Sequence, residues 1–188
     1  MRGRGALIYV MGPSGAGKDT LLAGARASLD PAAFVFAHRY ITRPPMPEDE
    51  NFVALSPTEF AARRAAGFFA FAWRARNVDY GIGAEIDAWR TMGLCVVVSG
   101  SRADWAGGAP ERAGAVPVLI TAPAELLARR LEDRGRDKDV AARLARADAF
   151  AIDAPHLVRV ENDGTVTEGV DALVAAFTAI RRGSAAAA

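Results

Sequence analysis

The chain has 188 residues, 51% of them hydrophobic, and a formal net charge of +1 at pH 7. This length suits one domain with a real hydrophobic core, and the charge gives no field that would draw the chain to nucleic acid or to a membrane surface. Cys95 is the only cysteine, which excludes an internal disulfide, and no run is long and apolar enough to span a bilayer. We therefore expect a cytoplasmic protein with a single domain over residues 1–183 and a disordered tail over 184–188.

A glycine-rich loop follows the first apolar run, Ala6–Met11, and precedes a helical pattern that starts with Leu21 and Leu22. The loop reads Gly12-Pro13-Ser14-Gly15-Ala16-Gly17-Lys18, which fits the spacing of a phosphate-binding P-loop. Glycines let successive backbone N–H groups point at one anion, and the helix that begins near Lys18 directs its positive dipole end to the same place. Lys18 would bridge the two outer phosphates of ATP. The alternative is a glycine-rich turn that binds nothing, but the strand before the loop and the helix after it disfavour that interpretation.

The residue after the P-loop lysine is unusual. The common P-loop carries Ser or Thr there as a magnesium ligand, and this chain carries Asp19. The hydroxyl of Thr20 lies about 100° further round the helix and would point elsewhere, although we count both residues among the nucleotide-binding positions. A carboxylate would repel a bare triphosphate, so we predict that Asp19 holds Mg²⁺, directly or through a water. The alternative is an acid that only complements the helix dipole.

Apolar runs alternate with helical patterns along the rest of the chain. Buried parallel strands are predicted at Ala6–Met11, Leu94–Ser99, Val116–Thr121 and Leu157–Val160, with a weaker strand at Phe34–His38. Helices are predicted to begin at Ser56–Glu59, at Pro123 and at Thr165–Glu168. This alternation predicts the α/β class, as a three-layer α/β/α P-loop domain with a parallel central sheet. Residues 39–90 are rich in proline, aromatic residues and arginine, and we expect them to form an insertion that holds the second substrate.

Polar and basic segments lie where the ligands of such a sheet should bind. Ser99-Gly100-Ser101-Arg102 follows one predicted strand, and His38–Arg43 follows another. A later basic cluster comprises Arg129, Arg130, Arg134, Arg136, Arg143 and Arg146. The Arg134-Gly135-Arg136 turn favours a lid over ATP, at about residues 129–146, because guanidinium groups can bind phosphate oxygens in a bidentate way. The alternative is two solvated helices whose arginines pair with neighbouring acids.

Taken together, these motifs resemble the guanylate kinase family from end to end. The resemblance is carried by the P-loop, Ile41-Thr42-Arg43, Asp79-Tyr80-Gly81, the arginine–glycine turn with Arg143-Leu144, and Asn162-Asp163. It implies that Arg43 and Tyr80 contact the acceptor phosphate and that Asn162 lies in the loop beside the adenine. It further implies catalytic roles, in offsetting charge on the transferred group, for Lys18, Arg130, Arg134, Arg136 and Arg143.

The departures from that family are equally informative. Phe71 and Ile82 stand where a guanylate kinase reads guanine with a glutamate and a threonine. Loss of such polar contacts costs about 10⁴-fold in discrimination, so this pocket should not hold guanine well. Met46, Phe52 and Ser99 replace, in turn, an acceptor arginine, an acceptor tyrosine and the acidic residue at the end of the central strand. With G-P-S-G-A-G-K-D-T, H-R-Y-I-T-R and V-V-V-S-G-S-R, the chain closely resembles the ribose 1,5-bisphosphokinases of phosphonate breakdown.

This second resemblance implies that ATP phosphorylates ribose 1,5-bisphosphate on its 1-phosphate to give 5-phosphoribosyl 1-diphosphate, with ATP and Mg²⁺ as cofactors and a small-molecule sugar phosphate as the substrate. The acceptor oxygen is already anionic, so no general base is needed, and His38 is interpreted as structural or as a phosphate contact. Candidate residues for holding the sugar bisphosphate are Arg39, Arg43, Tyr80, Ser99, Ser101 and Arg102. One alternative is a GMP kinase, which Phe71 and Ile82 disfavour. The other is a non-catalytic guanylate-kinase-like module, which the intact P-loop disfavours.

Overall fold

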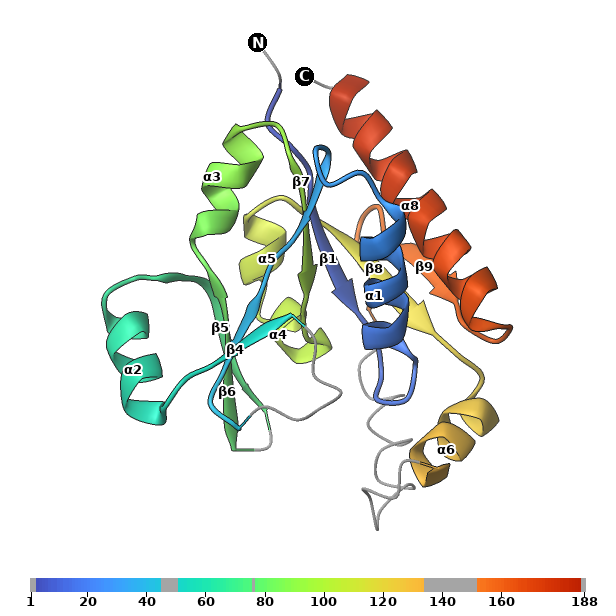
Figure 1. Cartoon of the computed structure of the whole chain (residues 1–188), viewed down its shortest axis with the longest axis horizontal. Helices are drawn as coiled ribbons and strands as arrows, with labels where there is room; N and C mark the ends of the chain where they lie inside the picture. The colour runs from blue at the N-terminus through green and yellow to red at the C-terminus, as the bar shows by residue number, and fades with distance from the viewer. Residues whose placement is uncertain (1–2, 45–50, 76, 134–151, 187–188) are drawn as a thin grey trace.

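The computed structural model describes residues 3–44, 51–75, 77–133 and 152–186. Its main sheet is parallel, with the strand order β2-β7-β1-β8-β9 (Figure 1). The strands are β1 Leu7–Met11, β2 Phe34–Phe36, β7 Cys95–Ser99, β8 Ala115–Thr121 and β9 Val158–Glu161. Each of their ends lies within two residues of its predicted run, because strands covered on both faces must be apolar nearly throughout.

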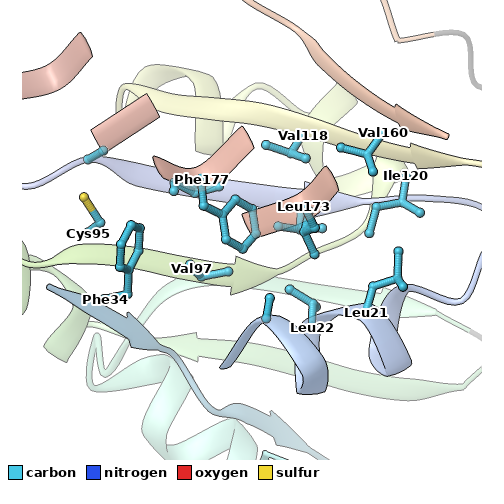
Figure 2. Packing of buried hydrophobic residues seen from close by; sticks show 14 of the residues in the cluster. Leu21, Leu22, Phe34, Cys95, Val97, Val118, Ile120, Val160, Leu173 and Phe177 are labelled. Atoms are coloured by element: carbon cyan, nitrogen blue, oxygen red, sulfur yellow. The ribbon is translucent and has the colours of Figure 1, made fainter. Parts of the chain in front are cut away.

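Helices cover both faces of this sheet, so the predicted three-layer α/β/α fold is confirmed. They are α1 Lys18–Ser28, α3 Glu85–Thr91, α4 Arg102–Ala106, α5 Ala109–Arg112, α6 Ala124–Asp133 and α8 Val166–Ala186. On one face, Ile8 and Val10 of β1 pack with α1 and with Leu173 and Phe177 of α8, and Figure 2 shows this cluster from close by. The alternate residues of β1 pack on the other face with α3, α4 and a second, smaller sheet.

The last helix begins where the sequence predicts and ends later. Thr165 and Glu168 form the reciprocal capping box, since Thr165 Oγ1 accepts from the Glu168 N–H at 3.3 Å and Glu168 Oε2 accepts from the Thr165 N–H at 2.8 Å. Helix α8 then continues through Ala186. The helix thus extends two residues beyond Ser184, at which the tail is predicted to begin.

The predicted insertion is a smaller sheet inserted between β2 and β7. Its strands, in the order β4-β3-β6-β5, are β3 Arg39–Ile41, β4 Phe52–Ala54, β5 Phe69–Ala75 and β6 Val78–Gly83. Between β4 and β5 lies α2, Pro57–Ala65, whose N-cap residue Ser56 accepts from the Glu59 N–H at 3.1 Å. Strands β3 and β4 run parallel, while β3–β6 and β5–β6 are antiparallel pairs. Helix α3, at the end of the predicted insertion, packs on β7 of the main sheet.

All main-sheet strands run in one direction, so their carboxyl ends meet at a single edge, and the P-loop after β1 lies there (Figure 1). The start of β1 and the end of α8 lie at the opposite end of the molecule, where the Arg181 guanidinium sits 5.8 Å above the Phe34 ring at the beginning of β2. Among the described residues, no helix has the length and apolarity needed to cross a membrane.

Candidate active site

The P-loop adopts a backbone shape that only glycine accommodates readily. Gly15 and Gly17 have φ values of 87° and 80°, in the left-handed region. A Cβ atom at Gly12 would lie 2.6 Å from the carbonyl oxygen of Ile120, so this residue allows the loop to pass close to β8. The loop leads directly into α1, whose first residue is Lys18. This strand–loop–helix arrangement is the one that binds phosphate groups.

Lys18 is held in place by the end of a neighbouring strand. Its Nζ donates to Ser99 Oγ at 2.6 Å and lies 3.1 Å from Asp19 Oδ1. Only 14% of the Lys18 side chain is exposed. Burial lowers the pKa of Lys18, and the Asp19 carboxylate acts in the opposite direction. Ser99, at the position where the family resemblance expects an acid, thus orients the P-loop lysine without neutralising it.

Asp19 links the P-loop to the smaller sheet. The same Oδ1 atom lies 3.1 Å from Lys18 Nζ and 3.4 Å from Arg39 Nη2. The Asp19 side chain is 70% exposed, as expected for the first turn of α1. Lys18 was predicted from the P-loop spacing and Arg39 as a sugar bisphosphate contact, and the structure brings the two cations to one carboxylate oxygen.

Two predicted acceptor motifs, distant in the sequence, become adjacent through strand pairing. Ile41 lies opposite Tyr80 in the β3–β6 pair. One residue further, Thr42 exchanges two hydrogen bonds with Asp79: its N–H donates to the Asp79 carbonyl at 3.1 Å, and its Oγ1 accepts from the Asp79 N–H at 2.8 Å. These two hydrogen bonds fix the start of the segment that carries Arg43.

Aromatic rings support both of these acceptor candidates. The Arg43 guanidinium lies 5.1 Å above the Phe52 ring, a distance typical of a cation–π contact, and its Nη1 donates to the Pro44 carbonyl at 3.1 Å. Tyr80 stacks on Trp73, with ring centroids 5.5 Å apart and an interplanar angle of 4°. Sequence analysis noted Phe52 only as a missing tyrosine and did not single out Trp73; alternation along a strand gives no signal for such a stack.

The segment after β7 is fixed by a tyrosine that the sequence analysis missed. Tyr9 of β1 donates from its hydroxyl to Asp104 Oδ2 at 2.6 Å and accepts from the Ser101 N–H at 3.0 Å. Ser101 Oγ accepts from the Ala103 N–H at 3.2 Å and caps α4, whose first residue is Arg102. A tyrosine inside an otherwise apolar strand was the available signal, because a buried hydroxyl needs a partner.

Asn162 contacts the P-loop. The residue is 5% exposed, and its Nδ2 donates to the Ala16 carbonyl at 2.8 Å. Its own carbonyl accepts from Arg130 Nη1 of α6 at 3.0 Å. A Cβ atom at Gly17 would lie 2.4 Å from that Asn162 nitrogen and 3.9 Å from Arg130 Nη1, so both residues lie against the loop. The predicted adenine contact of Asn162 stays a prediction.

The remaining predicted site residues divide into two groups. Ser14 and Thr20 are exposed at the P-loop and on the first turn of α1, and Pro13 is partly buried. The arginine–glycine turn of the predicted lid, with Arg134, Arg136 and Arg143, lies outside the described residues, as does Met46.

Phe71 and Ile82 fill the position predicted for a base-reading pocket. They lie opposite each other in the β5–β6 pair and are 4% and 0% exposed. The Tyr9 ring meets Phe71 edge-on, with centroids 5.9 Å apart and planes at 89°. These contacts are part of the second hydrophobic cluster. Packed apolar side chains therefore occupy the space beneath the smaller sheet.

A parallel sheet with a P-loop after its first strand, a partly buried P-loop lysine and an inserted smaller sheet define a P-loop kinase of the guanylate-kinase-like class. The crystal structure of guanylate kinase from Anaplasma phagocytophilum has this fold, with a TM-score of 0.68 at 18% identity, over 96% of this chain and 88% of that one. No family model matches the chain.

Curated sequences narrow the class. The ribose 1,5-bisphosphate phosphokinase PhnN of Desulfomicrobium baculatum is 48% identical over 170 residues, which cover 89% of this chain and 91% of that protein. The chain belongs to the ribose 1,5-bisphosphate phosphokinase family. The member from Laribacter hongkongensis is 50% identical over 173 residues, which cover 91% of this chain and 42% of that longer protein.

Proposed function

We propose that the protein transfers the γ-phosphoryl group of ATP to the 1-phosphate of ribose 1,5-bisphosphate and forms 5-phosphoribosyl 1-diphosphate and ADP. An oxygen of the 1-phosphate forms the new P–O bond, and the bond between the γ-phosphorus and the β–γ bridging oxygen breaks. The bridging oxygen leaves on ADP. Membership of the family supports the reaction, and the geometry of the site supports the roles of the residues.

One observation carries the assignment of the site: Lys18 and Arg39 converge on one oxygen of Asp19. Lys18 belongs to the donor loop and Arg39 to the sheet proposed for the acceptor. Phosphoryl transfer requires donor and acceptor phosphates to approach in line while positive charge offsets their repulsion. Lys18 and Arg39, which lie 3.1 Å and 3.4 Å from the same Asp19 oxygen, would supply this positive charge between the donor and the acceptor.

The acceptor would bind along β3 and β6. The hydrogen-bonded pair Thr42–Asp79 places the segment bearing Arg43 beside Tyr80. Guanidinium groups bind phosphate oxygens in a bidentate way. The Phe52 ring beneath Arg43 already limits the orientations of the guanidinium, so less conformational entropy is lost when a phosphate binds. A phosphate acceptor is already ionised near neutral pH, so these residues need only to bind and orient it.

The charge at Asp19 fits a role in magnesium binding. Mg²⁺ in kinases is commonly held by one or two carboxylates together with substrate phosphates and waters. When bound, Mg²⁺ would neutralise charge on the β- and γ-phosphates. Asp19 would then exchange part of its contact with Lys18 and Arg39 for the metal or one of its waters.

The competing activity is a GMP kinase, which shares the fold. Against it, Phe71 packs against Tyr9, Ile82 lies in the same hydrophobic cluster, and neither side chain offers a polar group to a base. The test is ADP release with ribose 1,5-bisphosphate and with GMP side by side, with the product identified by ³¹P NMR and Lys18→Ala as the control for contaminating kinases. We expect a kcat/KM for GMP lower by about 10⁴-fold. A preference for GMP would refute the proposal, and no transfer to either acceptor would favour the non-catalytic module.

A further inference from the structure

Tyr9 is a buried polar side chain beneath the active site for which the reaction described above has no use. It lies in the middle of β1, its residue is 0% exposed, and its hydroxyl is bonded on two sides. Asp104 Oδ2 accepts its proton at 2.6 Å, and the Ser101 N–H donates to it at 3.0 Å. Burial first, and the Asp104 carboxylate second, raise the pKa of Tyr9, so the hydroxyl keeps the proton that it donates.

The Tyr9 ring also shapes the segment that follows β7. A Cβ atom at Gly100 would lie 1.9 Å from the ring carbon Cζ, so only glycine lets the chain cross the ring here. Trp105 packs on the ring with centroids 5.6 Å apart, and Phe71 of the smaller sheet meets it at 5.9 Å. The ring and the hydroxyl of Tyr9 therefore fix the segment together: the ring limits the path of the backbone at Gly100, and the hydroxyl holds the backbone N–H of Ser101.

The segment held in this way carries residues already placed in the site. Ser101 and Arg102 are candidate contacts for the sugar bisphosphate. Ser99, which accepts the hydrogen bond from Lys18, is instead held by the main sheet, as the last residue of β7 opposite Val10 of β1. Tyr9 itself is enclosed and cannot touch a substrate. Its influence must pass through the backbone at Ser101 and through the Asp104 side chain at the start of α4.

We propose that Tyr9 and Asp104 form a positioning pair that holds Ser101 and Arg102 in the conformation that binds the acceptor phosphate. The proposal rests on the proposed function. It predicts that breaking the pair weakens binding of the acceptor while leaving the nucleotide site, built on the P-loop and Asn162, nearly intact. Loss of the pair should therefore affect the binding of one substrate and not of the other, although the pair contacts neither.

The first test is Tyr9→Phe, which keeps the ring and removes only the hydroxyl. The KM for ribose 1,5-bisphosphate should rise about 10- to 100-fold, the range for losing a hydrogen bond to a charged group, while the KM for ATP changes less than about 2-fold. Asp104→Ala should reproduce this change. Asp104→Asn keeps an oxygen that accepts from Tyr9 and should restore a KM near that of the wild type.

Combining the substitutions tests whether the two residues act as a pair. The double variant Tyr9→Phe/Asp104→Ala should be no worse than either single variant, because both remove the same interaction. Hydrogen exchange at the Ser101 amide gives a readout without substrate: it should accelerate in Tyr9→Phe and stay slow in Asp104→Asn. The matched control is Thr178→Val, which removes a hydroxyl bond to the Val174 carbonyl in α8, away from this segment, and should leave both KM values unchanged.

Two results would overturn the positioning role. One is a Tyr9→Phe protein with lower thermal stability but an unchanged KM for the acceptor. The other is an equal rise of both KM values, which would mean a general distortion of the site. A wild-type protein that does not phosphorylate ribose 1,5-bisphosphate would instead refute the proposed function. The same comparison would then be made with GMP as the acceptor, and an unchanged KM for GMP in Tyr9→Phe would refute the positioning role as well.

Discussion

The side-chain amide of Asn162 donates to the carbonyl oxygen of Ala16 across 2.8 Å and thereby joins the end of β9 to the phosphate-binding loop. The two residues are 146 positions apart in the sequence. The bond is buried, and it holds the loop from the side on which Gly17 leaves no room for a Cβ atom. Asn162 thus supports the P-loop through Ala16.

Replacing Asn162 should weaken nucleotide binding. Asn162→Ala removes the donor and leaves the Ala16 carbonyl without this partner, so the dissociation constant for ATP should rise about 2- to 10-fold, the range for one neutral hydrogen bond. Titration of ATP in the absence of acceptor measures the effect. Asn162→Asp, which keeps the size but cannot donate, should behave alike. Unchanged ATP affinity in both variants would restrict Asn162 to a role in stability.

Lys18→Ala should abolish transfer without unfolding the chain. The Lys18 ammonium contacts Ser99 and Asp19, and the residue belongs to neither hydrophobic cluster of the described part of the chain, so thermal unfolding should stay close to that of the wild type. Loss of a charge clamp on the transferring phosphoryl group should lower kcat by about 10³-fold or more. A coupled assay for ADP together with circular dichroism provides both measurements. A folded variant with normal turnover would reject the P-loop assignment.

Asp19→Asn should raise the magnesium concentration that gives half-maximal activity by about 10-fold, since the substitution keeps the size and removes the charge. Titration of activity with MgCl₂ at fixed ATP measures it. The alternative is that Asp19 only complements the dipole of α1, a contribution of about 0.3–1 kcal/mol, which corresponds to a fall in Tm of about 1–4 °C. Normal magnesium dependence with a lower Tm would support that alternative.

Arg43→Ala should raise the KM for the sugar bisphosphate about 10- to 100-fold and leave the KM for ATP nearly unchanged, because a charge-assisted contact to a phosphate is lost. Phe52→Leu removes only the ring beneath the guanidinium and should have a smaller effect in the same direction, of about 2- to 5-fold. Steady-state kinetics with each substrate varied in turn separates the two constants. A shift confined to ATP would assign Arg43 to the donor side.

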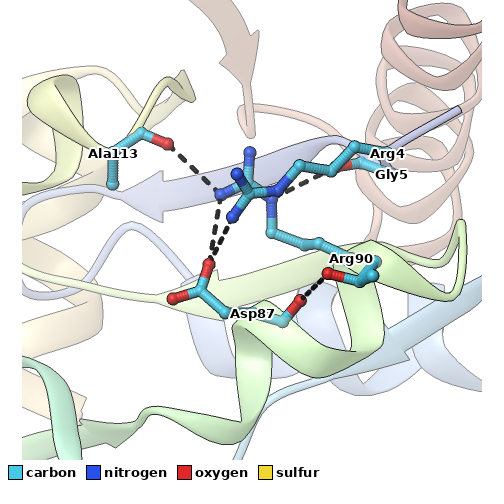
Figure 3. A network of polar contacts seen from close by, with 6 residues as sticks. Arg4, Gly5, Asp87, Arg90 and Ala113 are labelled. Carbon is cyan, nitrogen blue, oxygen red and sulfur yellow. Dashed lines mark hydrogen bonds and ion pairs between the residues drawn. The ribbon is translucent and has the colours of Figure 1, made fainter.

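Arg90 should matter for stability and not for catalysis. This residue of α3 is 8% exposed; its Nε donates to the Gly5 carbonyl and its Nη1 to the Ala113 carbonyl, both at 3.2 Å, and Asp87 lies beside it (Figure 3). Arg90→Met leaves two carbonyls without their donor and should lower the free energy of unfolding by about 2–4 kcal/mol.

Urea unfolding measures this loss of stability. Arg4→Ala, which breaks the exposed ion pair with Asp87, is the matched control and should cost less than about 1 kcal/mol. Equal losses in the two variants would contradict the importance of the buried carbonyl contacts. Altered KM values would contradict the separation of this network from the active site.

Local sequence patterns were sufficient for the framework of the fold. Apolar runs located the main strands, and glycine spacing located the P-loop, because burial on both sheet faces and close phosphate approach each impose a composition on consecutive residues. The meeting of Lys18 with Ser99 also follows in part, since the carboxyl ends of parallel strands share one edge.

Contacts between distant segments could not be predicted in the same way. Nothing in the spacing of Thr42 and Asp79 indicates that they exchange two hydrogen bonds, because strand register in the smaller sheet depends on how its strands pack. The bond from Asn162 to Ala16 and the bond from Tyr9 to Asp104 are likewise products of the assembled fold. The family resemblance singled out Asn162 as a residue beside the adenine, but no local pattern indicates its contact with the P-loop.

The polarity of the main sheet has a practical consequence. Both described ends of the chain, before β1 and at the close of α8, lie at the amino ends of the strands, while Lys18 and Ser99 lie at the carboxyl ends. A tether on either terminus therefore anchors the molecule by its far side. Chains coupled to a sensor surface in this way should present the P-loop edge of the sheet to the solution, so that nucleotide and sugar phosphate can be injected separately and in both orders to measure how each affects the affinity of the other.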